Sequence, residues 1–178
     1  MVNVQLSPWN TGDEVGFYVN LAVVPEPWRA WMAAQASEPV GAAVKEYNGL
    51  WRARLDPTST GGGSRGSWEV TNERTAEVAA LDVAQRLVDD GLPALQRSLD
   101  RTCMLDALRY GNPGELARAG WETHNGMALV VMLADTGPSP GLDVALATLL
   151  ERPSDVEDWD GRLELLQRWV EHRAASRN

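Results

Sequence analysis

Two side chains that can act as acid and base lie close together in the segment GWETHNG, at Glu122 and His124. A Glu-x-His pair can hold a metal ion or move a proton. A metal site needs a third ligand, and the only other histidine, His172, falls in the last turn of an expected helix, where a cation complements the helix dipole. The sequence therefore predicts no metal site and no cofactor.

The single cysteine, Cys103, is the one candidate thiol nucleophile of the chain. Its neighbours Thr102 and Met104 belong to an expected amphipathic helix that offers no activating base, so Cys103 is predicted to be a packing residue. A lone cysteine forms no internal disulfide, which agrees with a reducing compartment. The glycine-rich segment at 61–66 lacks the Gly-Lys-Ser/Thr ending of a phosphate loop and is predicted to be a linker.

Two arginines, Arg52 and Arg54, stand two residues apart in GLWRARLDP, so a pleated strand presents both on one face. Alternation of apolar and polar residues predicts antiparallel strands over residues 2–7, 16–24, 50–55 and 67–71. One face is then apolar, with Val2, Val4, Leu6, Phe17, Val19, Leu21, Trp51, Leu55, Trp68 and Val70. The opposite face carries Asn3, Gln5, Tyr18, Asn20, Arg52, Arg54, Glu69 and Thr71.

The polar side of this sheet is the candidate binding surface. One interpretation is a sheet face that only contacts solvent, because antiparallel sheets commonly have one face exposed to water. The other interpretation is recognition of an acidic peptide or a carboxylate ligand, because guanidinium groups pair with carboxylates through two parallel hydrogen bonds. The candidate binding residues are Gln5, Tyr18, Asn20, Arg52, Arg54 and, as an exposed anchor in a polar loop, Trp9.

Helical signals surround and follow the strands. A short helix is expected from Pro27, and after residue 72 the apolar period changes from two to about 3.6. The first long helix has Asn72 as its N-cap, one stripe of Leu81, Ala84 and Val88, and Gly91 as its stop, and the next begins at Leu92. Further helices are expected over 112–120, around 127–134, from the N-cap Ser139, and after a capping box of Ser154 and Glu157, the last with Leu163, Leu166, Trp169 and Val170 inward.

Composition bounds the class of protein. The chain has 178 residues, 44% of them hydrophobic, which fits one domain over residues 1–178. Strands first and helices afterwards predict the α+β class, with a sheet portion over 1–72 that includes one short helix and five to six helices over 73–178. A net charge of −9 argues against nucleic acid as a partner, and no apolar run has the length of a membrane span. The usage of one lysine against 15 arginines suggests a GC-rich bacterial genome, and the expected location is the cytoplasm.

The segments VNVQLSPWN, FYVNLAVV, LWRARL, WEV and GLPALQRSLD resemble the domain of unknown function 4304 family (DUF4304) of small bacterial proteins, over residues 2–110. The resemblance implies a further helix and strand ahead of the first strand of this chain. Since a complete strand follows Met1 at once, we expect either an edge strand or a start inside a longer gene. The family implies no activity and no catalytic residues.

Three functional hypotheses follow from these observations. The leading one is a non-enzymatic protein-binding module that uses the polar sheet face, with a protein partner that is basic, as for an immunity protein that neutralises a toxin. The second is a small-molecule enzyme with Arg52 and Arg54 as a carboxylate clamp and Glu122 or His124 as the base. The third is an accessory domain of a longer protein.

Overall fold

A computed structural model of the chain describes residues 1–8, 10–35, 49–58, 66–110, 121–151 and 158–177, with backbone only for 121–124. The strands are β1 (Val2–Leu6), β2 (Val15–Val23), β3 (Trp51–Leu55) and β4 (Trp68–Val70). The helices are α1 (Glu26–Gln35), α2 (Glu73–Arg86), α3 (Leu92–Leu99), α4 (Arg101–Tyr110), α5 (Trp121–Ala134), α6 (Pro140–Leu150) and α7 (Trp159–Ala175), with a π-helical turn η2 (Leu87–Gly91) between α2 and α3. The predicted α+β class is confirmed.

The chain forms two compact units. The first contains residues 1–24 and 44–100, and the second contains residues 25–43 and 101–178. The helices α2 and α3 therefore belong with the sheet, and α1 belongs with the later helices. The single domain over 1–178, divided at residue 72, stays a prediction.

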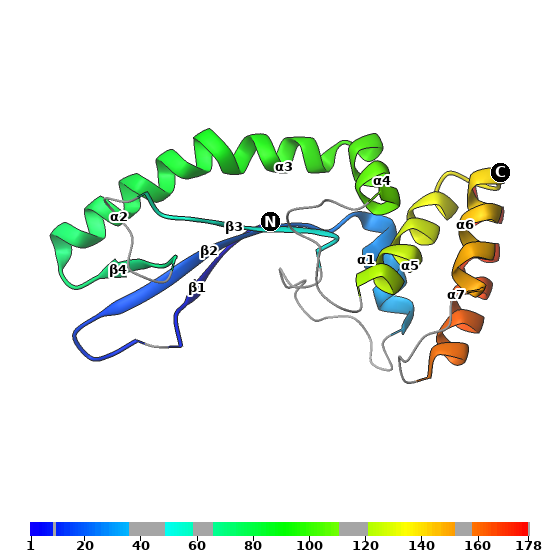
Figure 1. Ribbon diagram of the computed structural model, residues 1–178, viewed down its shortest axis with the longest axis horizontal. Coiled ribbons are helices and arrows are strands. Elements are labelled where there is room, and N and C mark those ends of the chain that lie inside the picture. The colour runs from blue at the N-terminus through cyan, green and yellow to red at the C-terminus, as the bar shows by residue number, and fades with distance from the viewer. Residues whose placement is uncertain (9, 36–48, 59–65, 111–120, 152–157, 178) are drawn as a thin grey trace. The chain divides into compact units, whose positions relative to one another are not determined.

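The sheet of the first unit is built around β2, which pairs antiparallel with β1, β3 and β4 (Figure 1). Strand β1 occupies one edge of β2, while β3 and β4 share the other edge. Val19, Leu21 and Leu55 are buried in one core with Trp68 and Ala79. The predicted separation into an apolar and a polar face is confirmed by this register.

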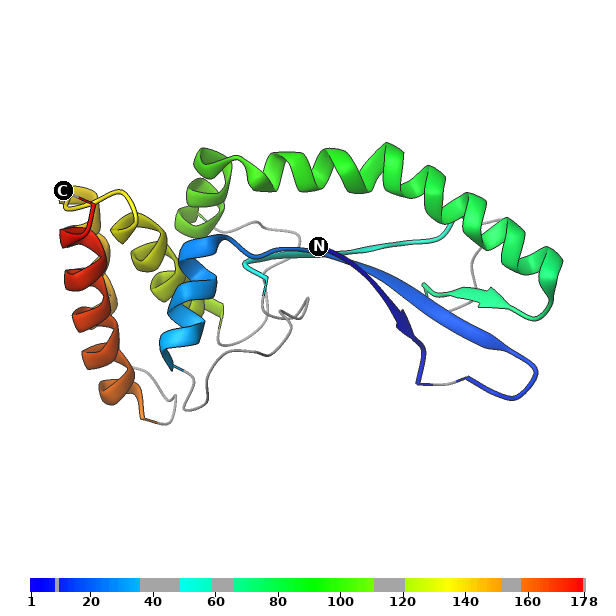
Figure 2. The same cartoon turned by 180° about the vertical axis from the view of Figure 1, so that it is seen from behind.

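The long helical segment of α2, η2 and α3 covers the apolar face over β2, β3 and β4 (Figure 2). The Asn72 cap is confirmed, because its side chain accepts a hydrogen bond from the Thr75 N–H at 3.1 Å. The hydroxyl of Thr75 accepts one from the Asn72 N–H at 3.0 Å in return. Ala79 is buried against the sheet, and Val83 and Leu87 pack on the same core.

The stripe of Leu81, Ala84 and Val88 lies on the outer side of this helix. Leu81 is 73% exposed and Val88 is 60% exposed. The helix carries more than one apolar stripe, and the stripe that meets the sheet is the one that contains the small residue Ala79.

The prediction that Gly91 stops the first helix is wrong. Gly91 has a helical φ of −66° and lies inside the π-helical turn, so the chain continues into α3. A Cβ at Gly91 would stand 3.3 Å from a methyl of Leu21 and 3.4 Å from one of Leu55. The glycine therefore serves the close approach of helix and sheet.

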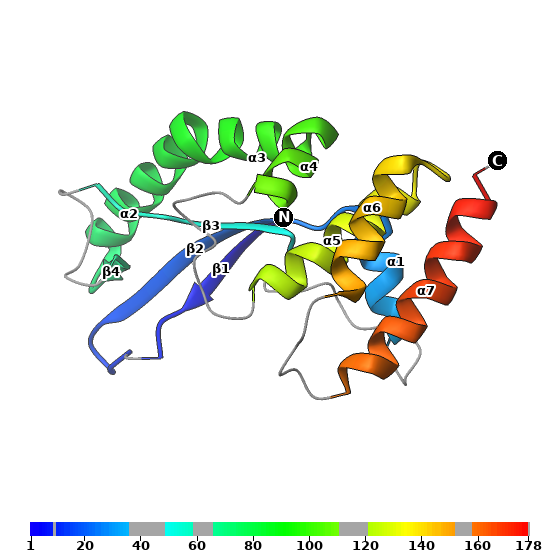
Figure 3. The same cartoon turned by 45° about the vertical axis from the view of Figure 1, so that its right-hand side comes forward.

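The second unit is organised around α5, against which α1, α4, α6 and α7 pack (Figure 3). Ala128, Val130 and Val131 of α5 are fully buried, as the run of apolar residues predicted. Trp31 of α1 is fully buried, and its ring meets the Trp169 ring edge-on with centroids 5.8 Å apart.

The N-terminal caps of α6 and α7 differ in geometry. The Ser139 hydroxyl caps α6 by accepting a hydrogen bond from the Leu142 N–H at 3.2 Å, as predicted. Helix α7 begins at Trp159 after Asp158, which has a left-handed φ of 55° and gives no side-chain cap. The predicted capping box of Ser154 and Glu157, like the helix expected over 112–120, lies outside the described residues. The inward positions Leu163, Leu166 and Val170 are buried, as predicted.

Candidate binding face

The register of the sheet brings the predicted binding residues together on three neighbouring strands. Gln5 of β1 stands opposite Tyr18 of β2, and Asn20 of β2 stands opposite Arg54 of β3. Residues directly opposite each other share one face of a sheet. Here "the polar face" means the side of the sheet that carries Asn3, Gln5, Tyr18, Asn20, Arg52 and Arg54.

The centre of the polar face is Asn20, which is 9% exposed. Its Nδ2 donates to the Oε1 of Gln5 at 2.9 Å, and its Oδ1 accepts from the Nε of Arg54 at 3.1 Å. Both ends of the Asn20 amide are thus used, which fixes its orientation. The three side chains form one chain of hydrogen bonds across β1, β2 and β3.

Arg54 is held in place from two sides. Its Nε is bound to Asn20, and its guanidinium carbon lies 4.2 Å from the centre of the Tyr18 ring. An arginine stacked on an aromatic face gains a cation–π attraction and loses part of its rotational freedom before any ligand arrives.

Three nitrogen atoms of the polar face have N–H groups that remain available within the described part of the chain. Among the described residues, no group accepts a hydrogen bond from the two terminal nitrogens of Arg54 or from the Nε2 of Gln5. Donors without an acceptor, on a positively charged and preorganised arginine, are suited to carboxylate oxygens. The arrangement can therefore bind an anionic group.

Arg52 and Trp9 complete the predicted set with different outcomes. Arg52 stands opposite Ala22 of β2, one pleat further along the same face, and it is half-buried. Trp9 lies outside the described residues. The structure thus places Gln5, Tyr18, Asn20 and Arg54 in contact and leaves Arg52 beside them.

A second polar cluster anchors α2 to the sheet unit, and the sequence analysis did not identify it. The carboxylate of Asp82 accepts hydrogen bonds from the Thr58 N–H at 3.0 Å, from the Thr58 hydroxyl at 2.8 Å and from the Trp68 indole at 2.9 Å. Burial alone would raise the pKa of Asp82, but the hydrogen bonds from Thr58 and Trp68 and the nearby charge of Arg86 outweigh it, so the pKa lies below its usual value. Because all three donors bind the Asp82 carboxylate, this cluster ties α2 to the sheet and has a structural role.

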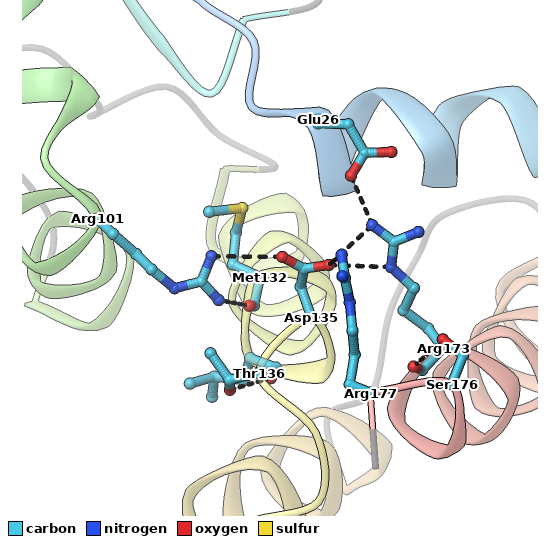
Figure 4. A network of polar contacts seen from close by, with 9 residues as sticks. Glu26, Arg101, Met132, Asp135, Thr136, Arg173, Ser176 and Arg177 are labelled. Carbon is cyan, nitrogen blue, oxygen red and sulfur yellow. Dashed lines mark hydrogen bonds and ion pairs between the residues drawn. The ribbon is translucent and has the colours of Figure 1, made fainter.

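In the second unit, Asp135 follows α5 and gathers several arginines (Figure 4). It accepts hydrogen bonds from the Nε of Arg173 at 3.0 Å and from a terminal nitrogen of Arg177 at 2.6 Å, and Arg101 lies 3.8 Å away. Arg173 also donates to Glu26 of α1 at 2.5 Å. These contacts connect α1, α4 and α7 to the end of α5.

The pKa of Asp135 reflects this setting. Burial alone would raise it, but the hydrogen bonds and charges of Arg177 and Arg173 hold the pKa below its usual range. Each arginine of the cluster contacts a carboxylate within it, so we assign the cluster a structural role.

The candidate catalytic residues of the sequence analysis lie in the second unit. Glu122 and His124 fall in the first turn of α5, and their side chains are outside the description. The enzyme hypothesis stays a prediction from sequence. Cys103 lies on α4 and is exposed, so its predicted role in packing is wrong.

A cavity of about 750 Å³ opens between α4, α5 and α6. Aliphatic side chains such as Leu129, Leu133 and Val144 form much of its wall, with Arg109 and Asn125 among the polar residues. Within the described residues this wall brings no acid and base together.

Neither a metal-ligand cluster nor a membrane-spanning helix is present in the described part of the chain. No three histidine, cysteine, aspartate or glutamate side chains there are grouped as metal ligands. No helix in the same part has both the length and the apolar character to cross a bilayer.

Comparison with known proteins gives one result. The model of the family described as Domain of unknown function (DUF4304) matches residues 1–97, which include the whole sheet, α2 and most of α3. Comparison with curated proteins and with solved structures finds no match. The matched residues exceed half of the 178-residue chain, so this protein belongs to the DUF4304 family.

Proposed function

We propose that this protein is a non-enzymatic protein-binding module of the bacterial cytoplasm that holds a carboxylate-bearing segment of its partner on the polar face. The observation that carries this proposal is the state of Arg54. Its guanidinium is fixed by Asn20 and Tyr18, while its terminal nitrogens bind no described residue.

An extended acidic segment fits the polar face better than a small ion. The free donors of Gln5 and Arg54 belong to strands separated by β2, which corresponds to roughly 10 Å across the sheet. A peptide with successive acceptors can reach donors that come from both strands. Both donors belong to side chains that hydrogen bonds to Asn20 already hold in place, so little further side-chain ordering opposes binding.

The charge of the whole chain supports a partner that is basic outside the contact. A net charge of −9 attracts a positively charged protein over a distance of about one Debye length and raises its association rate. Arg54 then selects a carboxylate within the contact. A small acidic protein that neutralises a basic toxin would combine these two properties, which is the immunity-like role that we propose.

The binding test uses a fluorescein-labelled glutamate-rich peptide as the probe and fluorescence anisotropy as the readout. Arg54→Gln removes the charge and the terminal nitrogens, and we expect a loss of affinity of about tenfold to hundredfold, since hydrogen bonds to charged groups are worth about 1.5–3 kcal/mol. Arg97→Gln, at an exposed arginine of α3 in the same unit, is the matched control and should bind as the unmodified protein does.

A second peptide distinguishes carboxylate recognition from nonspecific binding. The same peptide with every glutamate replaced by glutamine should bind far more weakly, because an amide cannot accept both hydrogen bonds of a guanidinium. Equal affinity for the two peptides, or equal loss in Arg54→Gln and Arg97→Gln, would contradict the proposal.

A further inference from the structure

Strand β1 has backbone groups at the border of the sheet that pair with no other described strand. The residues on either side of β1 bond to the chain of β2. The Met1 amine donates to the Ala22 carbonyl at 2.7 Å, and the Ser7 N–H donates to the Gly16 carbonyl at 2.8 Å, so the odd-numbered residues direct their backbone groups toward β2. Successive residues of a strand direct their backbone groups to opposite sides. The N–H and C=O groups of Val2, Val4 and Leu6 therefore point to the side on which no described strand pairs.

The side chains of the same three residues are also uncovered. Val2 is 47% exposed, Val4 61% and Leu6 65%, although they belong to the apolar face of the sheet. The segment VNVQL contains no charged residue and no proline. Proteins ordinarily protect an edge strand with such residues, so an edge without them is suited to pairing with another strand.

The other border of the sheet is protected in the ordinary way. It is divided between β3 and the three-residue strand β4, and β3 carries the charges of Arg52 and Arg54. Pairing by strand addition is therefore expected at β1 alone among the described strands.

We propose that β1 pairs antiparallel with β1 of a second copy of this chain, across a two-fold axis at Val4. The segment VNVQL reads apolar, amide, apolar, amide, apolar in both directions from Val4. Around that axis Val2 faces Leu6 of the partner, Asn3 faces Gln5, and Val4 faces Val4. All apolar side chains then lie on one side of the joined sheets and all amides on the other.

This self-complementarity is the reason to choose a second copy as the occupant. A two-fold contact must match a surface to itself, and here each residue of β1 meets a residue of its own chemical kind. A protein of charge −9 repels its own copies, and β1 is a segment at which no like charges meet. The contact of two five-residue strands is small beside a standard interface of about 1,600 Å², so the dimer should be weak, with a dissociation constant in the micromolar range or above.

The first experiment measures mass by sedimentation equilibrium over concentrations from micromolar to millimolar. We expect a monomer–dimer equilibrium that Val4→Lys shifts to the monomer, because it places two ammonium groups at the axis. Val78→Lys, at a valine of α2 that is 46% exposed, is the matched control and should leave the equilibrium unchanged. Far-ultraviolet circular dichroism verifies that both variants are folded.

The second experiment tests the register with a short bismaleimide cross-linker in a Cys103→Ser background, since Cys103 is the only native cysteine and is exposed. Val4→Cys should cross-link to itself. Val2→Cys should cross-link to Leu6→Cys in a mixture of the two proteins, and Val2→Cys alone should not.

Each other result rejects the inference. A monomer at every concentration shows that β1 does not self-associate, and a dimer that Val4→Lys leaves intact uses another surface. Cross-linking of Val2→Cys to itself indicates a parallel pairing. The inference does not depend on the proposed function, because Val4 lies on the opposite face of the sheet from Arg54, and peptide binding can be measured in the Val4→Lys monomer.

Discussion

The side chain of Asp82 shows how one residue can hold a helix to a sheet. Its two oxygens accept three hydrogen bonds from Thr58 and Trp68. An asparagine has a single acceptor oxygen and would turn an N–H group toward one of these donors. We expect Asp82→Asn to lower the free energy of unfolding of the sheet unit by about 1–3 kcal/mol at neutral pH, measured by urea denaturation.

The pH dependence of this effect has a definite sign. The pKa of Asp82 is lower in the folded protein, so its contribution is complete above the usual pKa of an aspartate and is lost as the pH falls through the lowered value. The urea midpoints of the unmodified protein and of Asp82→Asn should converge in acid. A difference that persists below that range would show that Asp82 acts through its shape and not through its charge. Asp89→Asn, at an exposed aspartate of η2, is the control at neutral pH.

Single residues also show where sequence reasoning succeeds. The period of two in β1, β2 and β3 correctly assigned Gln5, Tyr18, Asn20 and Arg54 to one face, because pleating leaves no freedom in that choice. It did not indicate that Asn20 would be the shared partner of Gln5 and Arg54, which depends on the pairing of three strands. Asp82 gave no signal, since a lone acidic residue in a helix resembles any solvated one.

At the scale of elements, the segment from α2 through α3 depends on the absence of a side chain at Gly91. An added Cβ would meet methyl groups of Leu87, Leu21 and Leu55 at 2.9, 3.3 and 3.4 Å. Gly91→Val should therefore lower the free energy of unfolding by about 1–3 kcal/mol through overpacking.

Alanine substitutions at two helical glycines, Gly141 and Gly91, distinguish the effect of close packing from that of helix propensity. Gly141→Ala in α6 has no atom closer than 4.0 Å to the added carbon and should gain up to about 1 kcal/mol from helix propensity. Gly91→Ala should show no such gain, because the contacts offset it. Equal stabilisation by the two substitutions in thermal unfolding would mean that helix and sheet are not in close contact at Gly91.

The same element explains which helical features were predictable from sequence. Caps such as Asn72 and Ser139 were correct, because a cap is a local hydrogen bond between neighbours in the chain. The end of a helix at Gly91 and the inward stripe of α2 were not, because both are decided by how closely the sheet approaches. A glycine in sequence looks the same whether it ends a helix or lets one pack tightly.

At the scale of the whole molecule, each compact unit has its own acid-sensitive tie, Asp82 in the first and Asp135 in the second. Asp135→Asn weakens the acceptor of Arg173 and Arg177, and the expected loss is about 2 kcal/mol. Hydrogen exchange followed by mass spectrometry should then rise in residues 121–151 and 158–177. The pKa of Asp135 is also lowered, so the effect should disappear in acid.

The effects of the two substitutions on hydrogen exchange can be compared between the two units. Asp82→Asn should raise hydrogen exchange in β4 and α2, whereas Asp135→Asn should leave those segments as they are. If either substitution raises exchange equally in both units, the chain unfolds as one cooperative body and the tie is not local to its unit.

The uncharged border at β1 has a consequence for how far association can proceed. A strand that joins its own copy about a two-fold axis uses up the surface through which it joined, so growth terminates at two chains. The opposite border, divided between β3 and β4 and carrying Arg52 and Arg54, offers no matching template for head-to-tail addition. Light scattering from concentrated solutions of this protein should accordingly give a molar mass no higher than that of a dimer. The same solutions should not form fibrils that bind thioflavin.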